Sequence, residues 1–313
     1  QGDFTNLAIN SLFKGSGSYM QSKDGEIDLL IVDEAHRLNE KSGMFKKGEN
    51  QVKEIIHAAK TSVFFIDAHQ QVTFLDIGSV EEIEKWAGYF NANITRMELP
   101  SQFRCSGSDG YLSWVDNSLG ISETANQDLD QSYDFRVYKD PTQMRSEIQR
   151  LDSKETPARV LAGYCWEWVS RRNPLQFDIQ FPEYDFHCRW NNFDLGQGWI
   201  MHDEAVNEIG CIHTSQGLEA GYVAVIIGGD LRCEEGELVT YPEEHPTADK
   251  NFSGLKGRIK AKDPTVYIEA ERLILNTYRT LMTRGMKGCF IYCVDKELEK
   301  YFCGLVGPER VYE

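Results

Sequence analysis

The chain has 313 residues, of which 41% are hydrophobic and 12% aromatic; this excludes a disordered protein and allows two domains that each bury a core. Its formal net charge of -16 excludes a protein dedicated to coating nucleic acid, because binding along a phosphate backbone depends on many basic side chains. The eight cysteines form no CxxC pair, and no apolar run reaches the roughly 18 residues of a membrane helix, so we expect a cytoplasmic protein without a zinc ribbon or a membrane partner.

The first predicted element is a strand over residues 27–32, where only Asp28 interrupts an apolar run. A nearly continuous run of this kind is typical of a strand that is buried on both faces in a parallel sheet. The run ends in Asp33 and Glu34. Doubly wound sheets bind ligands at the carboxyl ends of their strands, so this acidic pair lies where a ligand is expected.

Three more elements are predicted before residue 98: a helix over 51–60, a second buried strand over 62–66 that ends in Asp67, and a helix over 80–90. Ser79 is the expected N-cap of the last helix, with Glu82 three residues later as in a capping box. Strands that alternate with helices in this way predict an α/β fold with a parallel sheet.

A second unit is predicted from residue 99 to residue 313. Its expected elements are helices over 111–119, 142–152 and 268–283, and strands over 135–138, 158–162, 221–229 and 288–294. Two segments are predicted as insertions, an aromatic β-hairpin near 181–201 and a long loop near 230–263 with a basic end. Trp166, Trp168, Trp190 and Trp199 could stack on unpaired bases, but aromatic residues this dense favour a core role.

The pair Asp33-Glu34 is the first candidate for chemistry. In phosphoryl transfer one carboxylate holds Mg²⁺, directly or through water, and a second polarises the attacking water. A surface turn after a strand is the alternative, because Asp and Glu are common in such turns. The pair alone does not decide between the two.

Four further segments follow in order and change this balance. After IDLLIVDEAH come FFIDAHQQV, LPSQFRCSG, IHTSQGLEAGYVAVIIG and YRTLMTRGMKGCFIYC. Together they resemble motifs II to VI of superfamily 1 helicases, and in particular the bacterial Schlafen group 3-like DNA/RNA helicase domain family. The resemblance covers residues 12–301. The DEAH tetrapeptide is also similar to superfamily 2, but the Gln-Gly-Arg frame of that superfamily's last motif is absent from the sequence.

The resemblance implies two RecA-like P-loop NTPase domains with parallel sheets, residues 1–98 and 99–313, the first truncated at its N-terminus. It implies an ATP-dependent DNA or RNA helicase or translocase that uses ATP and Mg²⁺ and binds DNA or RNA, expected to be single-stranded. Asp33 would contact Mg²⁺, and Glu34 would orient the hydrolytic water. Gln70, in the frame begun by Asp67, would sense the γ-phosphate.

The second unit would supply the remaining roles. Arg104 and Arg284 would reach the γ-phosphate and stabilise the charge that builds in the transition state. Glu219 would bind the ribose, and Gly217 would let the backbone approach the nucleotide. Nucleic acid would be contacted by Thr214, Ser215, Gln216, Lys256 and Arg258. For the basic segment that holds the last two, a solvated loop is an equal alternative.

Three histidines, His36, His69 and His213, lie inside motifs and could link the nucleotide site to the nucleic-acid side, although polar coupling or packing explains them equally without a metal. No Gly-x-x-x-x-Gly-Lys-Ser/Thr loop occurs, and the Gly-rich segment 14–18 does not supply one. We therefore expect a chain that begins after its phosphate-binding loop and has weak or no ATPase activity. The alternative function is a regulatory or scaffolding NTP-binding module that unwinds nothing.

Overall fold

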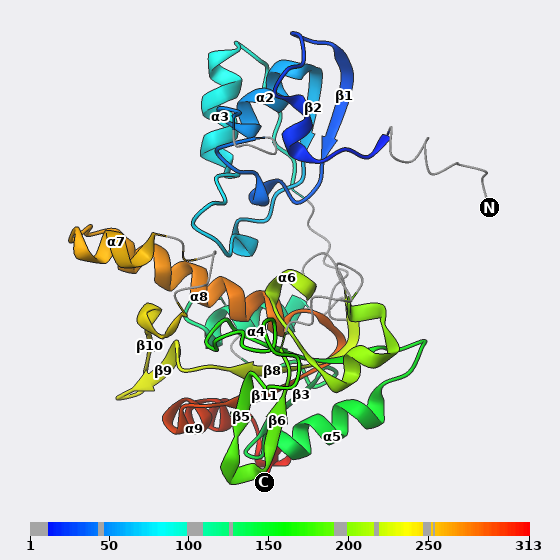
Figure 1. Cartoon of the computed structure of the whole chain (residues 1–313), viewed down its shortest axis with the longest axis vertical. Coiled ribbons are helices and arrows are strands. Elements are labelled where there is room, and N and C mark those ends of the chain that lie inside the picture. Colours follow the sequence, from blue (N-terminus) through cyan, green and yellow to red (C-terminus); the bar gives the residue numbers. More distant parts are fainter. Residues whose placement is uncertain are drawn as a thin grey trace. The chain divides into compact units, whose positions relative to one another are not determined.

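The computed structural model describes residues 12–42, 47–98, 109–124, 128–190, 199–215, 219–246, 252 and 254–313 (Figure 1). Arg104, Gln216 and Gly217 lie outside these residues. The chain divides into two compact units, residues 1–98 and 99–313. Among the described helices, none is long and apolar enough to cross a membrane.

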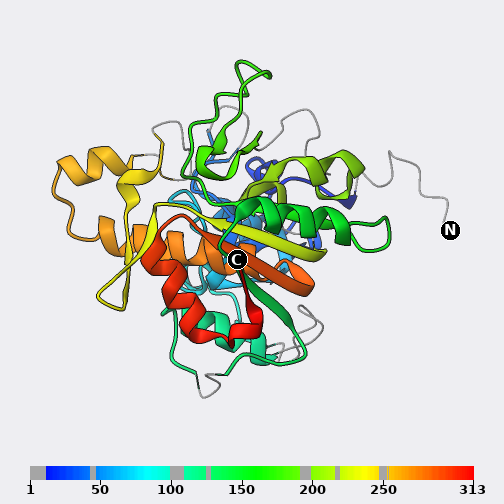
Figure 2. The same ribbon diagram turned by 90° about the horizontal axis from the view of Figure 1, so that it is seen from below.

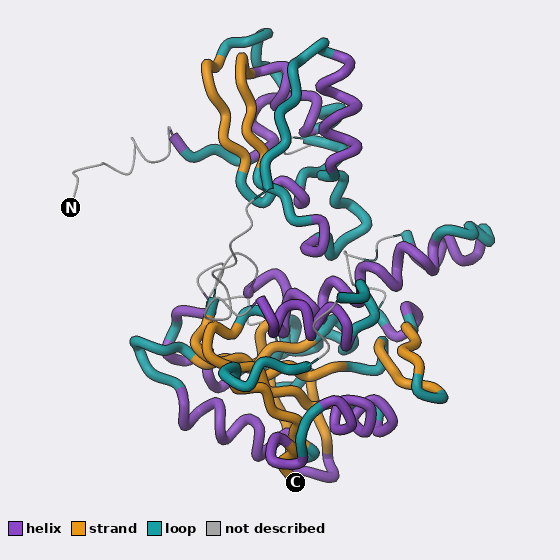
Figure 3. Tube along the Cα trace, turned by 180° about the vertical axis from the view of Figure 1, so that it is seen from behind, coloured by secondary structure: helices purple, strands orange, loops and turns teal. Residues whose placement is uncertain are grey.

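The first unit contains a two-stranded parallel sheet. Strand β1 (Ile27–Val32) pairs with β2 (Ala59–Phe64), so that Val32 lies opposite Phe64. Helices α2 (Gln51–Ala58) and α3 (Val80–Tyr89) lie on one side of the two strands (Figure 3). The predicted strand and helices are confirmed, and the Ser79 hydroxyl accepts a hydrogen bond from the Glu82 N–H at 3.1 Å, as the capping pattern predicts. Strand β2 begins three residues earlier than predicted.

The expectation that β1 is buried on both faces is wrong. Leu30 and Val32 pack against the core of the helices, whereas Leu29 and Ile31 are 51% and 65% exposed. Successive side chains of a strand point to opposite faces, and only one face of this sheet carries helices. An apolar run therefore shows that both faces avoid charge, and it does not show that both are covered.

The second unit is built on a six-stranded sheet in the order β12-β3-β11-β8-β4-β7, and all of its pairs are parallel. The strands are β3 (Asp134–Tyr138), β4 (Ala158–Ala162), β7 (Ile209–Gly210), β8 (Ala220–Ile227), β11 (Gly285–Cys293) and β12 (Val311–Tyr312). The predicted α/β class is thus confirmed. The assignment of each unit as a RecA-like domain stays a prediction.

Helices cover both faces of this sheet, as continuous apolar strands require. Helix α5 (Pro141–Leu151) packs on one face together with the hairpin of β5 (Ile179–Phe181) and β6 (Phe186–Cys188). Figure 2 shows α5 and α9 (Lys296–Leu305) on opposite sides of the strands. Helices α4 (Asp109–Ser118) and α8 (Val266–Met282) join α9, and Trp114 of α4 meets Phe135 edge to face at 4.7 Å. Trp190 and Trp199 are fully buried, which confirms their core role.

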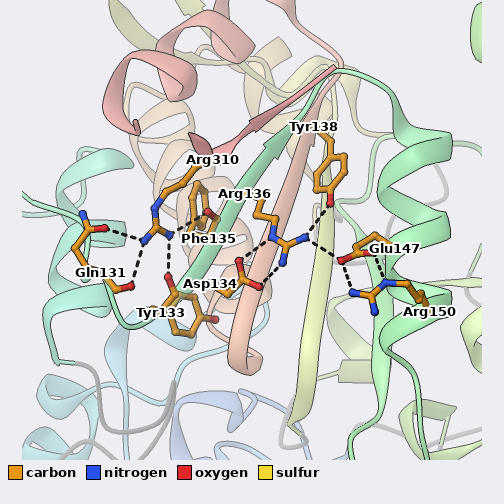
Figure 4. Close-up of polar contacts among 9 residues, drawn as sticks. All are labelled: Gln131, Tyr133, Asp134, Phe135, Arg136, Tyr138, Glu147, Arg150 and Arg310. Atoms are coloured by element: carbon orange, nitrogen blue, oxygen red, sulfur yellow. Dashed lines mark hydrogen bonds and ion pairs between the residues drawn. The ribbon is translucent and has the colours of Figure 1, made fainter. Parts of the chain in front are cut away.

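Polar groups close the β3 side of the sheet. Strand β12 pairs only with Val137 and Tyr138, and the Arg310 guanidinium donates hydrogen bonds to the carbonyl oxygens of Tyr133 and Phe135 at 2.9 and 3.2 Å (Figure 4). Arg310 therefore satisfies carbonyl groups that an edge strand would otherwise expose. On the face toward α5, Arg136 pairs with Asp134 and Glu147 (Figure 4).

The segment predicted as a long loop at 230–263 contains regular structure. It holds the hairpin of β9 (Leu231–Glu234) and β10 (Glu237–Thr240), and the short helix α7 (Leu255–Lys260). A buried polar cluster ties it to the sheet: Asp230 contacts His245 and Tyr278, all less than a tenth exposed.

Candidate functional site

The first unit brings its candidate residues to one edge. Because β1 and β2 are parallel neighbours, Asp33-Glu34 and Asp67 leave the sheet at the carboxyl ends of adjacent strands. Asp33 is exposed, and one of its carboxylate oxygens accepts a hydrogen bond from the Glu34 N–H at 2.9 Å. This is the edge at which sequence analysis expected a ligand.

Glu34 has an unusual backbone and a buried partner. Its φ of 51° and ψ of 43° lie in the left-handed region, which a residue with a side chain rarely adopts. The turn carries Ala35 back toward β2, where its N–H donates to the Phe65 carbonyl at 2.8 Å. The Glu34 carboxylate then lies 2.9 Å from Nε2 of His36, whose side chain is only 2% exposed.

Asp67 orders the turn that follows β2. Its carboxylate accepts hydrogen bonds from the His69 N–H at 3.0 Å and from the Gln70 side-chain amide at 2.8 Å. Gln70 is 3% exposed, which rules out the exposed turn residue that sequence analysis considered as its alternative. Asp67 thus fixes the side chain that the helicase resemblance assigns to the γ-phosphate.

Sequence analysis missed the contribution of Gly78. A Cβ atom at this position would lie 1.7 Å from the Ala35 carbonyl oxygen, and the neighbouring Ile77 N–H donates to the Leu38 carbonyl at 2.7 Å. The loop therefore packs directly on the backbone that follows Glu34. The sequence signal was a lone glycine just before a helix N-cap.

In the second unit the candidate residues lie at the opposite end of the strands. Glu219 immediately precedes β8 and Arg284 immediately precedes β11, and these strands pair with Ala220 opposite Gly285. The Ala220 N–H donates to the Arg284 carbonyl at 3.0 Å. Residues 65 positions apart in the sequence are therefore neighbours at the amino-terminal edge of this sheet, although the rule for α/β sheets points to the carboxyl-terminal edge.

The two neighbours differ in exposure. Glu219 is exposed, whereas Arg284 is only 1% exposed and its Nε donates to the Thr280 carbonyl at 3.3 Å. Arg284 can reach a phosphate only if the groups that cover it move. Sequence analysis expected an accessible arginine, and its role as a γ-phosphate contact stays a prediction.

The residues predicted to contact nucleic acid are mostly engaged within the unit. The Ser215 hydroxyl is buried and donates to the Cys211 carbonyl at 3.1 Å, and the Thr214 hydroxyl bonds to the same carbonyl at 3.0 Å. Arg258 forms ion pairs with Asp263 and Glu269, each at 2.7 Å. Lys256 is exposed on α7. The basic segment is therefore partly neutralised, and its role stays a prediction.

The residues present fit a magnesium ion carried by a nucleotide better than one held by the protein alone. Within the described ranges, no three His, Cys, Asp or Glu side chains converge as metal ligands. Mg²⁺ retains waters and needs only one or two carboxylates in addition to substrate phosphates. The exposed Asp33 can supply one such carboxylate.

Parallel sheets covered by helices, with an ordered carboxylate pair at a strand end, define an α/β protein consistent with the RecA-like class. The chain belongs to the family described as Schlafen group 3, DNA/RNA helicase domain, whose model matches residues 2–295. It is also similar to an uncharacterized protein of Saccharomyces cerevisiae, at 24% identity over 307 residues. That match spans 90% of this chain and 65% of the yeast protein.

The yeast relative corrects one expectation. We expected a bacterial family, but the family reaches into a eukaryote. The motifs could not have shown this, because nucleotide chemistry constrains them in the same way in any organism. The Schlafen group 3 assignment itself is confirmed.

Proposed function

We propose that the full-length gene product is an ATP-dependent motor on DNA or RNA, a helicase or translocase. The observation that supports this most directly is the Glu34 carboxylate, which a buried histidine holds at a strand end beside the exposed Asp33. A surface turn has no need of a left-handed residue fixed in this way. Family membership supports the nucleic-acid side of the proposal.

In this proposal each residue of the first unit has one task. Asp33 contacts Mg²⁺, which when bound neutralises charge on the nucleotide phosphates. Glu34 orients the water that attacks the γ-phosphate and accepts a hydrogen bond from it. Gln70, held by Asp67, senses whether the γ-phosphate is present.

The second unit contributes groups for the same nucleotide. Glu219 hydrogen-bonds the ribose, with Gly217 giving the backbone room to approach, and Arg104 and Arg284 stabilise the transition-state charge. The pairing of β8 with β11 supports a shared role, because it makes Glu219 and Arg284 neighbours. The burial of Arg284 implies that hydrolysis requires a rearrangement around it.

Nucleic acid, expected to be single-stranded, is held by a local patch in this proposal. Lys256 is its best-supported member because it is exposed on α7. Arg258, Thr214 and Ser215 can contribute only by exchanging their present hydrogen bonds, and Gln216 completes the predicted set.

A regulatory or scaffolding NTP-binding module is the second candidate. The formal net charge of -16 and the ion pairs that occupy Arg258 favour it, because both weaken attraction to phosphates. Binding of single-stranded DNA and RNA over a salt series separates the two functions. A motor should bind with an affinity that falls steeply as salt rises, whereas salt-independent or absent binding favours the module.

Steady-state ATP hydrolysis by the full-length gene product tests the catalytic part. We expect Glu34→Gln to lower kcat by about 10²- to 10⁴-fold, the usual contribution of a group that handles the proton of the nucleophile. Glu40→Gln is the matched control, since Glu40 is an exposed glutamate of the same unit. Equal kcat values for both variants would contradict the role of Glu34.

A further inference from the structure

We propose that His36 is a positioning residue for Glu34: its ring fixes one carboxylate oxygen and leaves the other to face the hydrolytic water. The inference rests on the proposed hydrolysis of ATP with Glu34 as the group that orients water. It assigns His36 a specific task, whereas the sequence left three histidines equivalent.

The contact is selective between the two oxygens of Glu34. Oε2 lies 2.9 Å from His36 Nε2 and is shielded from solvent, while the Glu34 side chain as a whole is 28% exposed. The accessible part of the carboxylate is therefore on the other side of the group. A carboxylate held at one oxygen loses the free rotation that would spread the other over many positions.

The surroundings of the ring assign its proton. A neutral imidazole has one N–H donor and one acceptor nitrogen. The Asp67 N–H approaches Nδ1 of His36 at 3.5 Å, which is long but places a donor at this nitrogen. Nδ1 is therefore the acceptor, and the proton resides on Nε2, where it points to Glu34. Glu34 is the stronger of the two contacts.

The backbone holds both residues in place. Glu34 adopts its left-handed conformation immediately before Ala35, which is pinned on one side by the Phe65 carbonyl and on the other by Gly78. A rare backbone conformation persists only where the surrounding structure enforces it. Because Glu34 and His36 flank this pinned residue, their side chains meet with little freedom to separate.

The same ring also joins the two strand ends. On its Nδ1 side it meets Asp67, which orients Gln70 through a 2.8 Å hydrogen bond. Glu34 and Gln70 are thus linked through only two intervening residues, His36 and Asp67. Movement of Gln70 at the γ-phosphate would be transmitted to the carboxylate that orients the water.

Two substitutions separate the two contacts of the ring. In His36→Gln the amide nitrogen reaches about as far as Nε2 and still donates to Glu34. In His36→Asn the shorter side chain retains an acceptor near Nδ1 but does not reach Glu34. His57→Asn is the matched control, because His57 is a half-exposed histidine on α2 of the same unit.

We expect His36→Asn to lower the kcat of the full-length gene product by about 10- to 100-fold with little change in KM for ATP, as is usual when an orienting partner is removed. His36→Gln should recover most of the activity, and His57→Asn should match the wild type. In the unaltered protein, long-range ¹H–¹⁵N NMR spectra should show His36 with its proton on Nε2.

The outcomes distinguish this inference from the proposed function. If Glu34→Gln is inactive while His36→Asn retains wild-type kcat, the role of Glu34 stands and that of His36 is overturned. Equal losses in both His36 variants, accompanied by equal losses in thermal stability, also overturn it, as does a proton on Nδ1. If the wild-type protein hydrolyses no ATP, the proposed function fails and this inference falls with it.

Discussion

The hydroxyl of Tyr278 donates a hydrogen bond to the buried carboxylate of Asp230 and also accepts one from the Gly228 N–H at 2.9 Å. Tyr278 lies on α8, whereas Gly228 and Asp230 follow β8, so a single hydroxyl joins a helix to the carboxyl end of a central strand. Burial raises the pKa of the Asp230 carboxyl group, but the hydrogen bonds from His245, Cys165 and Tyr278 outweigh it and the pKa ends below its usual value.

We predict that Tyr278→Phe lowers the free energy of unfolding by about 1–3 kcal/mol, because it leaves a buried carboxylate and a buried N–H with one partner fewer. Urea denaturation at neutral pH measures this change. Tyr267→Phe is the control on the same helix, since the Tyr267 side chain is 48% exposed and its hydroxyl meets only Glu243 at the surface. Equal effects of the two substitutions would show that the buried cluster contributes nothing special.

Gly78→Ala should destabilise the protein by about 1–3 kcal/mol, the usual cost of forcing atoms into a filled site. The added Cβ would meet the Ala35 carbonyl oxygen at 1.7 Å, and neither backbone can yield without disturbing the turn at Glu34. Gly88→Ala is the matched control, because Gly88 lies within α3 and nothing surrounds its Cβ position. Alanine favours a helix over glycine, so this control should be neutral or stabilising. Unfolding midpoints for the pair provide the comparison.

Much of the fold could be predicted because its signals are local. The apolar run of β1 and the Ser79 cap of α3 specify their elements within a few residues, and both agree with the structure. Helix α9 and strand β12 were not predicted. Strand β12 has two residues, too few for an alternating pattern, and its position depends on pairing with distant β3.

The candidate site was predictable in its residue types and not in its geometry. Nothing in the sequence shows that Glu34 takes a left-handed conformation, and only this turn brings residues 34 and 36 together. Nor does it show that Arg284 is buried or that Arg258 is held by two carboxylates. These properties depend on which distant elements pack nearby, which a motif does not encode.

Burial on one face of β1 predicts unequal costs for two isoleucines of the first unit. Ile55, 1% exposed on α2, should lose about 2–5 kcal/mol of unfolding free energy when replaced by alanine, because the change leaves a cavity in the core. Ile31→Ala should cost less than about 1 kcal/mol, since this side chain is 65% exposed. Chemical denaturation of the two variants measures the difference. A large cost at Ile31 would mean that the outer face of the sheet is covered in solution.

The ion pairs of Arg258 predict a measurable acid titration. Hydrogen bonds from the Thr265 N–H, then from Arg258, lower the pKa of Asp263 to about 2. A carboxyl group whose pKa is lower in the folded state contributes stability that is present above its unfolded pKa of about 3.9 and is lost as the pH falls toward about 2. We predict that Arg258→Ala moves the Asp263 pKa upward, toward its usual value, as measured by the carboxyl carbon shift in NMR titration. Lys256→Ala, on the exposed side of α7, should leave it unchanged. An Asp263 pKa that ignores the loss of Arg258 would show that the guanidinium is not committed to this pair in solution, and would strengthen its proposed role on a phosphate backbone.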